Sequence, residues 1–406
     1  MPRCHICETE YQPLISFGRM PIANGFLTEA QFSGEYFFDL AMGFCQQCLM
    51  VQLAEQPRRE LMFNDQYPFF SGTSQGMIAH FREFAGQVRR EFLNGPDPLV
   101  VEIGSNDGIM LEYYRQAGMR HLGVEPSANV AQVAIDRGLD TMVIFFDADC
   151  ARRIVADKGQ ADAFLGANVM CHIPYLHSII EGIELLCKPS GVAVFEDPYL
   201  GDVIQKTSYD QIYDEHVFLF SAHSVQNAFA RHGWELIDVR HQETHGGSMR
   251  YVLSRRGARP VAPTVARQLV LERELGLHLP QTYIAFEREC RRSRDQLKAL
   301  LSNLRRQGKR VVGYAATSKS TTILNYGQIG PDLIEFISDT TPIKQGKFSP
   351  GMHIPVRPYR EFAGRYPDYA VLFAYNHAQE IMAKERAFIS AGGRWIMFVP
   401  RVEIMA

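Results

Sequence analysis

Tyr213, Asp214, Glu215 and His216 place a phenol, two carboxylates and an imidazole in four consecutive positions. If this stretch is helical, Tyr213 and His216 stand three residues apart on one face, so both side chains can reach the same proton. Such a pair suits general acid–base chemistry. The alternative is a polar loop with one solvated histidine. Which of the two interpretations holds depends on the segments that position these residues.

A glycine-rich turn stands well before this cluster, in residues 98–118, which read PLVVEIGSNDGIMLEYYRQAG. An apolar strand, a glycine turn and a helical pattern are typical of the first unit of a doubly wound sheet. Glu102, Gly104 and Gly108 give an ExGxxxG spacing, whereas dinucleotide-binding proteins carry GxGxxG. A dinucleotide site brings a helix N-terminus against a pyrophosphate, which S-adenosylmethionine lacks. The turn, with Asn106 and Asp107 inside it, therefore favours S-adenosylmethionine.

Polar residues follow the next predicted strands at their carboxyl ends. Glu125 ends the strand in HLGVEPS, about twenty residues after the glycine turn, where an acid can accept both ribose hydroxyls. NAD would use the same acid, so Glu125 alone does not separate the cofactors. Further strands are predicted at TMVIFFD, ADAFLGANVMCHIP and LLCKPSGVAVFEDPYL. Asn168 and His172 fall in the loop after the fourth strand and would face the methyl donor. A hydrogen bond to a nearby carbonyl is the alternative for His172.

Four of the eight cysteines form two CxxC pairs, Cys4 with Cys7 and Cys45 with Cys48. Each such turn can direct two sulfurs at one tetrahedral Zn²⁺ about 2.3 Å away. Four thiolates leave no open coordination position, so we expect a structural ion. A redox pair or free core cysteines are the alternatives. The other cysteines are scattered, which in a reducing compartment argues against a disulfide framework.

A second strand–turn–helix pattern begins at KRVVGYAATSKSTTILNY, near the C-terminal end. Ser318 and Lys319 stand there at a helix N-terminus, where backbone N–H groups, hydroxyls and an ammonium suit a phosphate. A solvated helix start is the alternative for Lys319. We also assign Asn376 and His377, in the strand-like segment YAVLFAYNHAQEIMAK, to substrate binding.

The 406 residues are therefore predicted to form an α/β protein of three parts. These are a small zinc-binding domain at 1–65, a Rossmann-like class I methyltransferase domain at 66–255 with a helical connector to about 306, and a second Rossmann-like domain at 307–406. A net charge of -3 argues against nucleic acid as a partner. Without an apolar leader or a run of membrane-span length, we expect a cytoplasmic protein with no membrane partner. Without coiled-coil heptads, we expect a monomer.

Motifs along nearly the whole chain resemble those of the three-domain C-methyltransferases that act on nucleotide-linked 4-keto-deoxysugars, the group containing the 3-C-methyltransferase of the tetronitrose pathway. The motifs are CHIC, FCQQCLMVQL, VEIGSNDGIML, CHIPY, FEDPYLGD, QIYDEH, HGGSMRY, GYAATSKS, DTTPIKQG and HIPVRP. Ser105 stands where the family has a cysteine, a change that should leave cofactor binding intact. The segment YPFFSG also departs from the family, and it bears on the identity of the sugar.

The resemblance implies a zinc-bearing N-terminal domain, a central S-adenosylmethionine domain and a C-terminal domain that holds a dTDP- or GDP-linked 4-keto-deoxysugar. The matched positions make Tyr213, Glu215, His216 and His172 active-site residues. They also place Tyr67 near the acceptor, although the composition of its segment slightly favours a plain domain connection.

Methylation of carbon beside a ketone requires an enolate, and hence a base that removes the neighbouring proton. The ordinary pKa of histidine, about 6.5, suits this better than that of tyrosine, about 10. His216 is therefore our predicted base, with Tyr213 second, and His172 or Tyr213 would donate to the C4 oxyanion. We expect Glu215 to orient His216 or bind a sugar hydroxyl, and Asp214 to be solvated.

Methylation at C3 is the favoured outcome. Methylation at C5 is the nearest alternative, because C5 also adjoins the ketone. Methylation of a sugar oxygen would also need a base. From a different class of protein, a zinc-stabilised nucleotide-sugar-binding protein without activity would not need the ExGxxxG and YDEH motifs, which argue for an enzyme.

Overall fold

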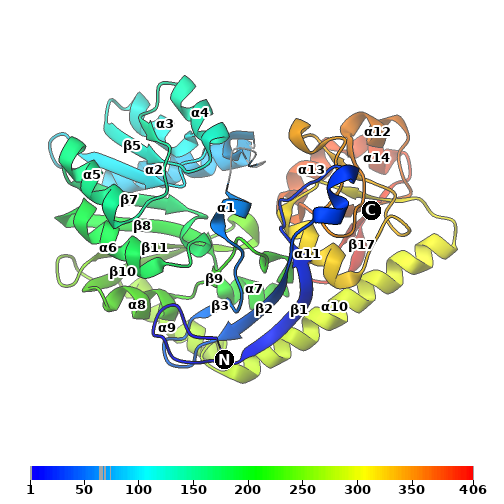
Figure 1. Ribbon diagram of the computed structural model, residues 1–406, viewed down its shortest axis with the longest axis horizontal. Helices are drawn as coiled ribbons and strands as arrows, with labels where there is room; N and C mark the ends of the chain where they lie inside the picture. The colour runs from blue at the N-terminus through cyan, green and yellow to red at the C-terminus, as the bar shows by residue number, and fades with distance from the viewer. Residues whose placement is uncertain (1, 64–66, 68–69, 74, 406) are drawn as a thin grey trace.

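The fold is α/β, as predicted, and is organised around three sheets. The computed structural model describes residues 2–63, 67, 70–73 and 75–405. Figure 1 shows two lobes side by side, the left one built on a seven-stranded sheet and the right one on a six-stranded sheet. A smaller four-stranded sheet runs below and between them.

The seven-stranded sheet has the order β10-β11-β8-β7-β4-β5-β6. Its strands are β4 (Leu99–Ile103), β5 (Arg120–Val124), β6 (Thr141–Met142), β7 (Ala161–Ala167), β8 (Cys187–Pro198), β10 (Trp234–Gln242) and β11 (Ser248–Arg255). The neighbours from β6 to β8 are parallel, whereas β11 is antiparallel to both β8 and β10. The predicted third strand, TMVIFFD, contributes only the two residues of β6.

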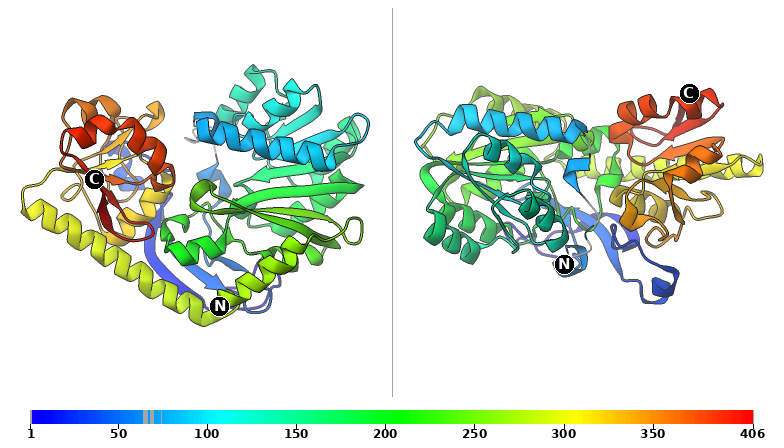
Figure 2. Two further views of the ribbon diagram at one scale, coloured as in Figure 1. Left: turned by 180° about the vertical axis from the view of Figure 1, so that it is seen from behind. Right: turned by 90° about the horizontal axis from the view of Figure 1, so that it is seen from above.

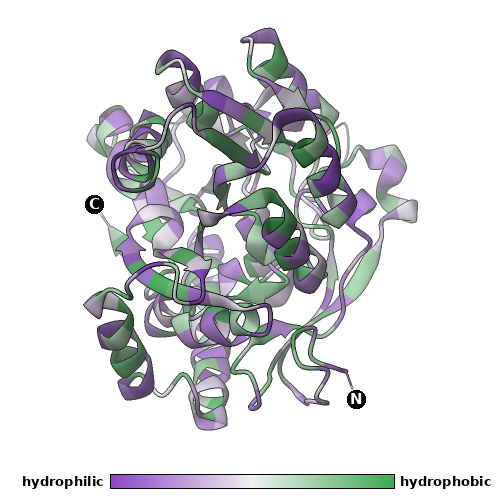
Figure 3. Ribbon diagram, turned by 90° about the vertical axis from the view of Figure 1, so that its left-hand side faces the viewer, coloured by the Kyte–Doolittle hydropathy of each residue, from purple (hydrophilic) through white to green (hydrophobic). Residues whose placement is uncertain are grey.

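Helices cover both faces of this sheet (Figure 2). On one face lie α2 (Gln75–Phe92) and α3 (Ile109–Gln116), and on the other lie α5 (Ala148–Lys158), α6 (Leu176–Leu186) and α8 (Ala222–Ala230). All five residues of β4 are buried because the parallel sheet is covered twice, so the strand is a continuous apolar run broken only by Glu102. Figure 3 shows that helices of the molecule carry both hydrophobic and hydrophilic residues along their length. The remaining helices of the lobe are α4 (Ala128–Asp136) and α7 (Leu200–Lys206).

The four-stranded sheet joins the N-terminal segment to the central lobe. It consists of β1 (Pro13–Pro21), β2 (Phe37–Phe44), β3 (Val51–Leu53) and β9 (Phe218–Leu219), all antiparallel, and is followed by the short helix α1 (Arg59–Met62). Strand β9 comes from the central part of the chain and begins two positions after His216. The Tyr213–His216 segment is therefore tied to the N-terminal sheet.

The right-hand lobe is a second Rossmann-like unit, parallel except at its last strand. Its order is β14-β13-β12-β15-β16-β17. The strands are β12 (Val311–Tyr314), β13 (Ile337–Asp339), β14 (Val356–Pro358), β15 (Tyr369–Leu372), β16 (Arg394–Met397) and β17 (Glu403–Met405). The helices are α11 (Ser318–Gly327), α12 (Tyr359–Gly364), α13 (Ala378–Lys384) and α14 (Arg386–Ser390).

Two helices, α9 (Pro263–Glu274) and α10 (Pro280–Arg306), form the predicted connection between the lobes. Leu297, Leu301 and Leu304 of α10 pack in the same core as the β1–β2 hairpin and one face of the six-stranded sheet. The N-terminal hairpin and the C-terminal lobe thus share a core. Among the residues that the structure describes, no helix is long and apolar enough to cross a membrane.

Candidate active site

A cavity of about 470 Å³ lies where the carboxyl ends of strands from both lobes meet. Gly104, Glu125 and Asn168 follow β4, β5 and β7 on one side, and Ser318 and Lys319 begin α11 on the other. Ligands in open α/β sheets bind at these carboxyl ends. Each lobe can therefore bind one ligand in this cavity.

The Tyr213–His216 segment enters this cavity as a turn. The helix considered for it is not formed, since the backbone N–H of His216 donates to the Tyr213 carbonyl at 3.0 Å and the chain then passes into β9. The turn brings the Tyr213 hydroxyl within 2.9 Å of His216 Nε2. The solvated-loop alternative also fails, because His216 is 4% exposed.

The hydrogen bonds of His216 fix its tautomer. Its Nδ1 lies 2.7 Å from the backbone carbonyl of Gln211, which can only accept, so Nδ1 carries the proton. Burial, together with the nearby Lys319 ammonium, holds the pKa of His216 well below its ordinary range. The neutral imidazole then has its Nε2 lone pair free to accept the Tyr213 hydroxyl proton. Burial raises the pKa of Tyr213 well above its ordinary value, so this proton stays on the phenol in the resting site.

Glu215 was expected either to orient His216 or to bind a sugar hydroxyl, and its hydrogen bonds go to residues other than His216. Its Oε1 accepts from Asn24 Nδ2 at 2.6 Å, and its Oε2 accepts from the Tyr67 hydroxyl at 3.1 Å. The Gln211 carbonyl orients His216 instead. Burial raises the pKa of Glu215 to about 7, so the carboxyl is divided between its two protonation states near neutral pH.

Asp214 corrects another expectation, because it is 1% exposed and not solvated. Its Oδ1 accepts from the backbone N–H of Ala23 at 3.0 Å. Burial raises the pKa of Asp214 well above its ordinary range. Asp214 therefore anchors the turn to the N-terminal domain.

His172 forms the wall beside the imidazole of His216. Its ring stacks on His216 at 5.3 Å and on Phe63 at 5.7 Å. Burial lowers the pKa of His172 to about 3, and its Nε2 has no hydrogen-bond partner within the described part of the chain. Cys171, His172 and His216 lie close enough to share a metal ion, but both ring nitrogens of His216 are already hydrogen-bonded. His216 is therefore positioned by hydrogen bonds.

The end of the cavity formed by the central sheet fits S-adenosylmethionine. Glu125 Oε2 accepts from the backbone N–H of Asn106 at 3.0 Å, and its Oε1 accepts from that of Ser127 at 2.8 Å. The fixed carboxylate keeps lone pairs for ribose hydroxyls. Gly104 has φ +58°, and an added Cβ would lie 2.7 Å from Val169, so this close turn requires glycine.

Two buried ammonium groups belong to the end of the cavity that the C-terminal lobe forms. Lys319 Nζ donates to the His245 carbonyl at 3.4 Å, and Lys344 Nζ donates to the Ala316 carbonyl at 2.8 Å. Burial lowers the pKa of both lysines. Because a buried cation gains from an anionic partner, this end is suited to a phosphate group.

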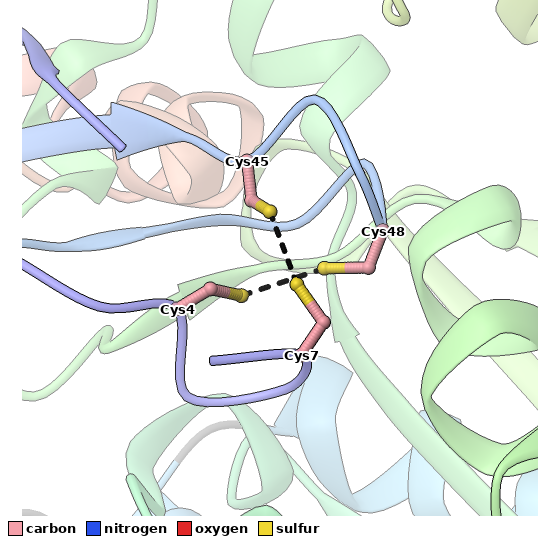
Figure 4. A group of neighbouring side chains, drawn as sticks. All are labelled: Cys4, Cys7, Cys45 and Cys48. Atoms are coloured by element: carbon pink, nitrogen blue, oxygen red, sulfur yellow. Dashed lines mark hydrogen bonds between the residues drawn. The ribbon is translucent and has the colours of Figure 1, made fainter. Parts of the chain in front are cut away.

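In the N-terminal segment, Cys4, Cys7, Cys45 and Cys48 form one cluster, with their sulfurs directed toward one another (Figure 4). The Cys4–Cys48 and Cys7–Cys45 sulfur pairs are each 3.4 Å apart, and all four ligand atoms lie within 4.8 Å of one another. Thiolates about 2.3 Å from a tetrahedral Zn²⁺ need sulfur spacings of this order. The cluster therefore fits one zinc ion with four protein ligands.

Comparisons with known proteins agree with this arrangement. Residues 4–63 match a zinc binding domain, residues 77–239 a methyltransferase domain, and residues 243–400 the C-methyltransferase C-terminal domain. The chain is 35% identical over 407 residues to the C-methyltransferase NovU of Streptomyces niveus, across 99% of this chain and 96% of that protein. The chain belongs to this C-methyltransferase family. The C-methyltransferase is an S-adenosylmethionine-dependent enzyme with a zinc-binding domain, as predicted.

Parts of the C-methyltransferase also resemble solved structures at low scores. An S-adenosylmethionine-dependent methyltransferase from Anabaena variabilis is 14% identical, covering 43% of this chain and 84% of its own, with a TM-score of 0.36. The PH0226 protein from Pyrococcus horikoshii is 12% identical, covering 50% of this chain and 100% of its own, with a TM-score of 0.37. These scores are too low to inform the site.

Most of the predicted site residues of the C-methyltransferase come together in the cavity lining. They are Tyr67, Gly104, Asn106, Glu125, Asn168, His172, Tyr213, Glu215, His216, Ser318, Lys319, Asn376 and His377. Glu102, Asp107 and Gly108 do not line it. The Asp107 carboxylate accepts from the backbone N–H of Gly72 at 3.0 Å, and Gly108 packs on Leu139, where a Cβ would lie 2.2 Å from a methyl carbon. Glu102 is buried in β4, and burial raises its pKa well above the ordinary range.

Asn24, Arg59 and Lys344 are among the polar lining residues that the sequence reasoning missed. The first two belong to the N-terminal domain and approach the cavity from far along the chain. The Arg59 guanidinium lies 4.1 Å from the centre of the Phe145 ring, near the cofactor end. Lys344 stands in the motif DTTPIKQG, where two threonines and a lysine after a strand were a usable signal for phosphate binding.

Proposed function

We propose that the enzyme methylates a carbon atom of a nucleotide-diphosphate-linked 4-keto-deoxysugar, at C3. The observation that carries this proposal is one cavity lined by the Tyr213–His216 pair, Glu215, the cofactor residues of the central sheet and two buried lysines. We place the ketone of the sugar beside the pair and the diphosphate against the lysines. Position C3 rests on the resemblance of the QIYDEH, HGGSMRY and DTTPIKQG segments to the sugar C-methyltransferases.

The Tyr213–His216 pair is our proposed base. Breaking the C3–H bond leaves its electron pair in an enolate, and the proton passes to His216 Nε2, either directly or through the Tyr213 hydroxyl. Nδ1 remains bonded to the Gln211 carbonyl, which supports the positive charge that develops on the ring. The low pKa of His216 keeps its base form populated at neutral pH.

The enolate oxygen at C4 needs a hydrogen-bond donor in this dry pocket. The unpartnered Nε2 of His172 serves if it is the protonated nitrogen, and the Tyr213 hydroxyl serves once His216 no longer accepts from it. S-adenosylmethionine supplies an electrophilic methyl group when bound. Glu125, Asn168 and the glycine turn would hold this cofactor in register with the acceptor carbon.

We expect the Lys319→Met and Lys344→Met variants to bind the nucleotide sugar about tenfold to a hundredfold more weakly, since each loses a charge-assisted contact to phosphate. Cofactor affinity should be unchanged, because the lysines belong to the C-terminal lobe, whereas the predicted cofactor residues follow strands of the central sheet. Calorimetric titration with the nucleoside diphosphate and with S-adenosylhomocysteine measures both. Lys384→Met, at the end of α13, is the matched control. Equal nucleotide affinity in wild type and both variants would remove the phosphate role.

Hydrogen exchange separates methylation of carbon from methylation of oxygen. In D₂O with S-adenosylhomocysteine bound, wild-type enzyme should exchange the C3 hydrogen of a 4-keto nucleotide sugar for deuterium, as seen by proton NMR. Exchange at C5 instead would favour the C5 alternative. A wild-type enzyme that exchanges neither hydrogen but still transfers methyl would favour the O-methyltransferase alternative.

A further inference from the structure

The zinc-binding domain contributes a side chain to the active site. We propose that Asn24 is a positioning residue that holds the Glu215 carboxylate in place, so that the N-terminal domain has a direct part in catalysis. This inference rests on the proposed function insofar as that function places Glu215 at the acceptor. The contact joins residues 191 positions apart, across the boundary between the N-terminal sheet and the cavity.

Hydrogen bonds around Asn24 connect the N-terminal domain to the Tyr213–His216 turn and to α11. Its Nδ2 donates to Glu215 Oε1 at 2.6 Å, and the backbone N–H of the preceding Ala23 donates to Asp214 Oδ1 at 3.0 Å. The Ala23 carbonyl accepts from Thr321 Oγ1 of α11 at 2.9 Å. One short segment after β1 thus binds two consecutive carboxyl groups of the turn and the helix that begins with Ser318 and Lys319.

Asn24 completes the hydrogen bonding of Glu215. The Tyr67 hydroxyl occupies Oε2, and the Asn24 amide occupies Oε1, so each oxygen has one fixed donor. Both donors are uncharged, and together they set the plane of the carboxyl group. Asn24 itself lines the cavity, so removing its amide would leave Oε1 to face the acceptor without a protein partner.

This arrangement has a consequence for proton binding. A donor to a carboxylate stabilises the ionised form, so the Asn24 amide works against the burial that raises the pKa of Glu215 to about 7. The titratable groups facing Glu215 are Tyr67, Cys171, Tyr213, Asp214 and Lys344. Of these groups only Lys344 is a cation, so it alone could stabilise the Glu215 charge when the Asn24 amide is removed. The Lys344 ammonium also donates to the Ala316 carbonyl.

The test compares zinc-loaded wild type with Asn24→Ala and Asn24→Asp, using Asn303→Ala on the exposed face of α10 as the control. Infrared titration of the protonated carboxyl band, assigned by its loss in Glu215→Gln, gives the pKa of Glu215 without any substrate. Asn24→Ala should raise it by about one unit. Asn24→Asp, which keeps the shape of the side chain, should raise it further because two adjacent carboxyls share a proton.

Kinetics gives the second readout. The acidic limb of the pH profile of kcat/KM should move to higher pH in both Asn24 variants, by the same interval as the infrared midpoint, with zinc content unchanged. An unchanged Glu215 midpoint in both variants would overturn the proposal, as would loss of zinc without a shifted midpoint. If wild type forms no C-methylated sugar, the proposed function fails, whereas the infrared comparison still decides the role of Asn24.

Discussion

His216→Asn should lower kcat for methyl transfer by about 10²- to 10⁴-fold, the range that one general base contributes. Asparagine keeps a donor toward the Gln211 carbonyl but cannot take a proton at the Nε2 position beside Tyr213. Affinity for S-adenosylhomocysteine should stay within about twofold of wild type, because the cofactor groups Gly104, Glu125 and Asn168 lie on other elements.

Single-turnover transfer from labelled S-adenosylmethionine and calorimetric titration measure the two quantities. His278→Asn, in the exposed loop between α9 and α10, is the matched control and should resemble wild type. Deuterium exchange at the acceptor carbon should fall together with kcat. If the His216 variant exchanges at nearly the wild-type rate, His216 is not the base, and Tyr213 takes that role.

Cys4→Ser should abolish stoichiometric zinc binding and unfold the N-terminal sheet at lower temperature than wild type. Structural Zn²⁺ stabilises small fingers by about 10–16 kcal/mol, and a site with three thiolates retains only part of this. The Cys45–Cys48 turn joins β2 to β3, and the backbone N–H of Leu53 in β3 donates to the Val217 carbonyl at 2.8 Å, next to His216. Displacing the catalytic turn by about 1 Å would cost on the order of 10²-fold in rate.

Zinc content by atomic emission, calorimetric unfolding and methyl transfer test this coupling on one preparation. Cys150→Ala, a buried cysteine of α5 outside the cluster, is the control and should keep its zinc and most of its activity. Full activity in a zinc-free Cys4 variant would separate the metal from the catalytic turn.

Several correct predictions rest on local signals. The Gly104 turn after a buried apolar strand and the two CxxC pairs each specify their geometry within a few residues. The class of the fold and the connecting helices followed from such patterns. The juxtaposition of Tyr213 and His216 was also predicted, although a turn, and not the helix considered, brings it about.

The contacts that the sequence did not reveal are those between distant segments. Asp214 was expected in solvent because an acid is rarely buried, but the backbone N–H of Ala23 reaches it across the domain boundary. Asn24 becomes a partner of Glu215 because β1 ends close to the catalytic turn. The periodicity of the sequence does not predict this contact between distant segments. The motif DTTPIKQG was a local signal for Lys344, but only the structure shows that this lysine lines one cavity together with Lys319.

The most direct test of the account is the position of the new methyl group. Wild-type enzyme would be incubated with [methyl-¹³C]-S-adenosylmethionine and a dTDP- or GDP-linked 4-keto-deoxysugar, and the product examined by two-dimensional carbon–proton NMR. We predict a labelled methyl bonded to C3, with a long-range correlation to the ketone carbon C4. A label on oxygen or on C5, or no transfer to any 4-keto sugar, would contradict it.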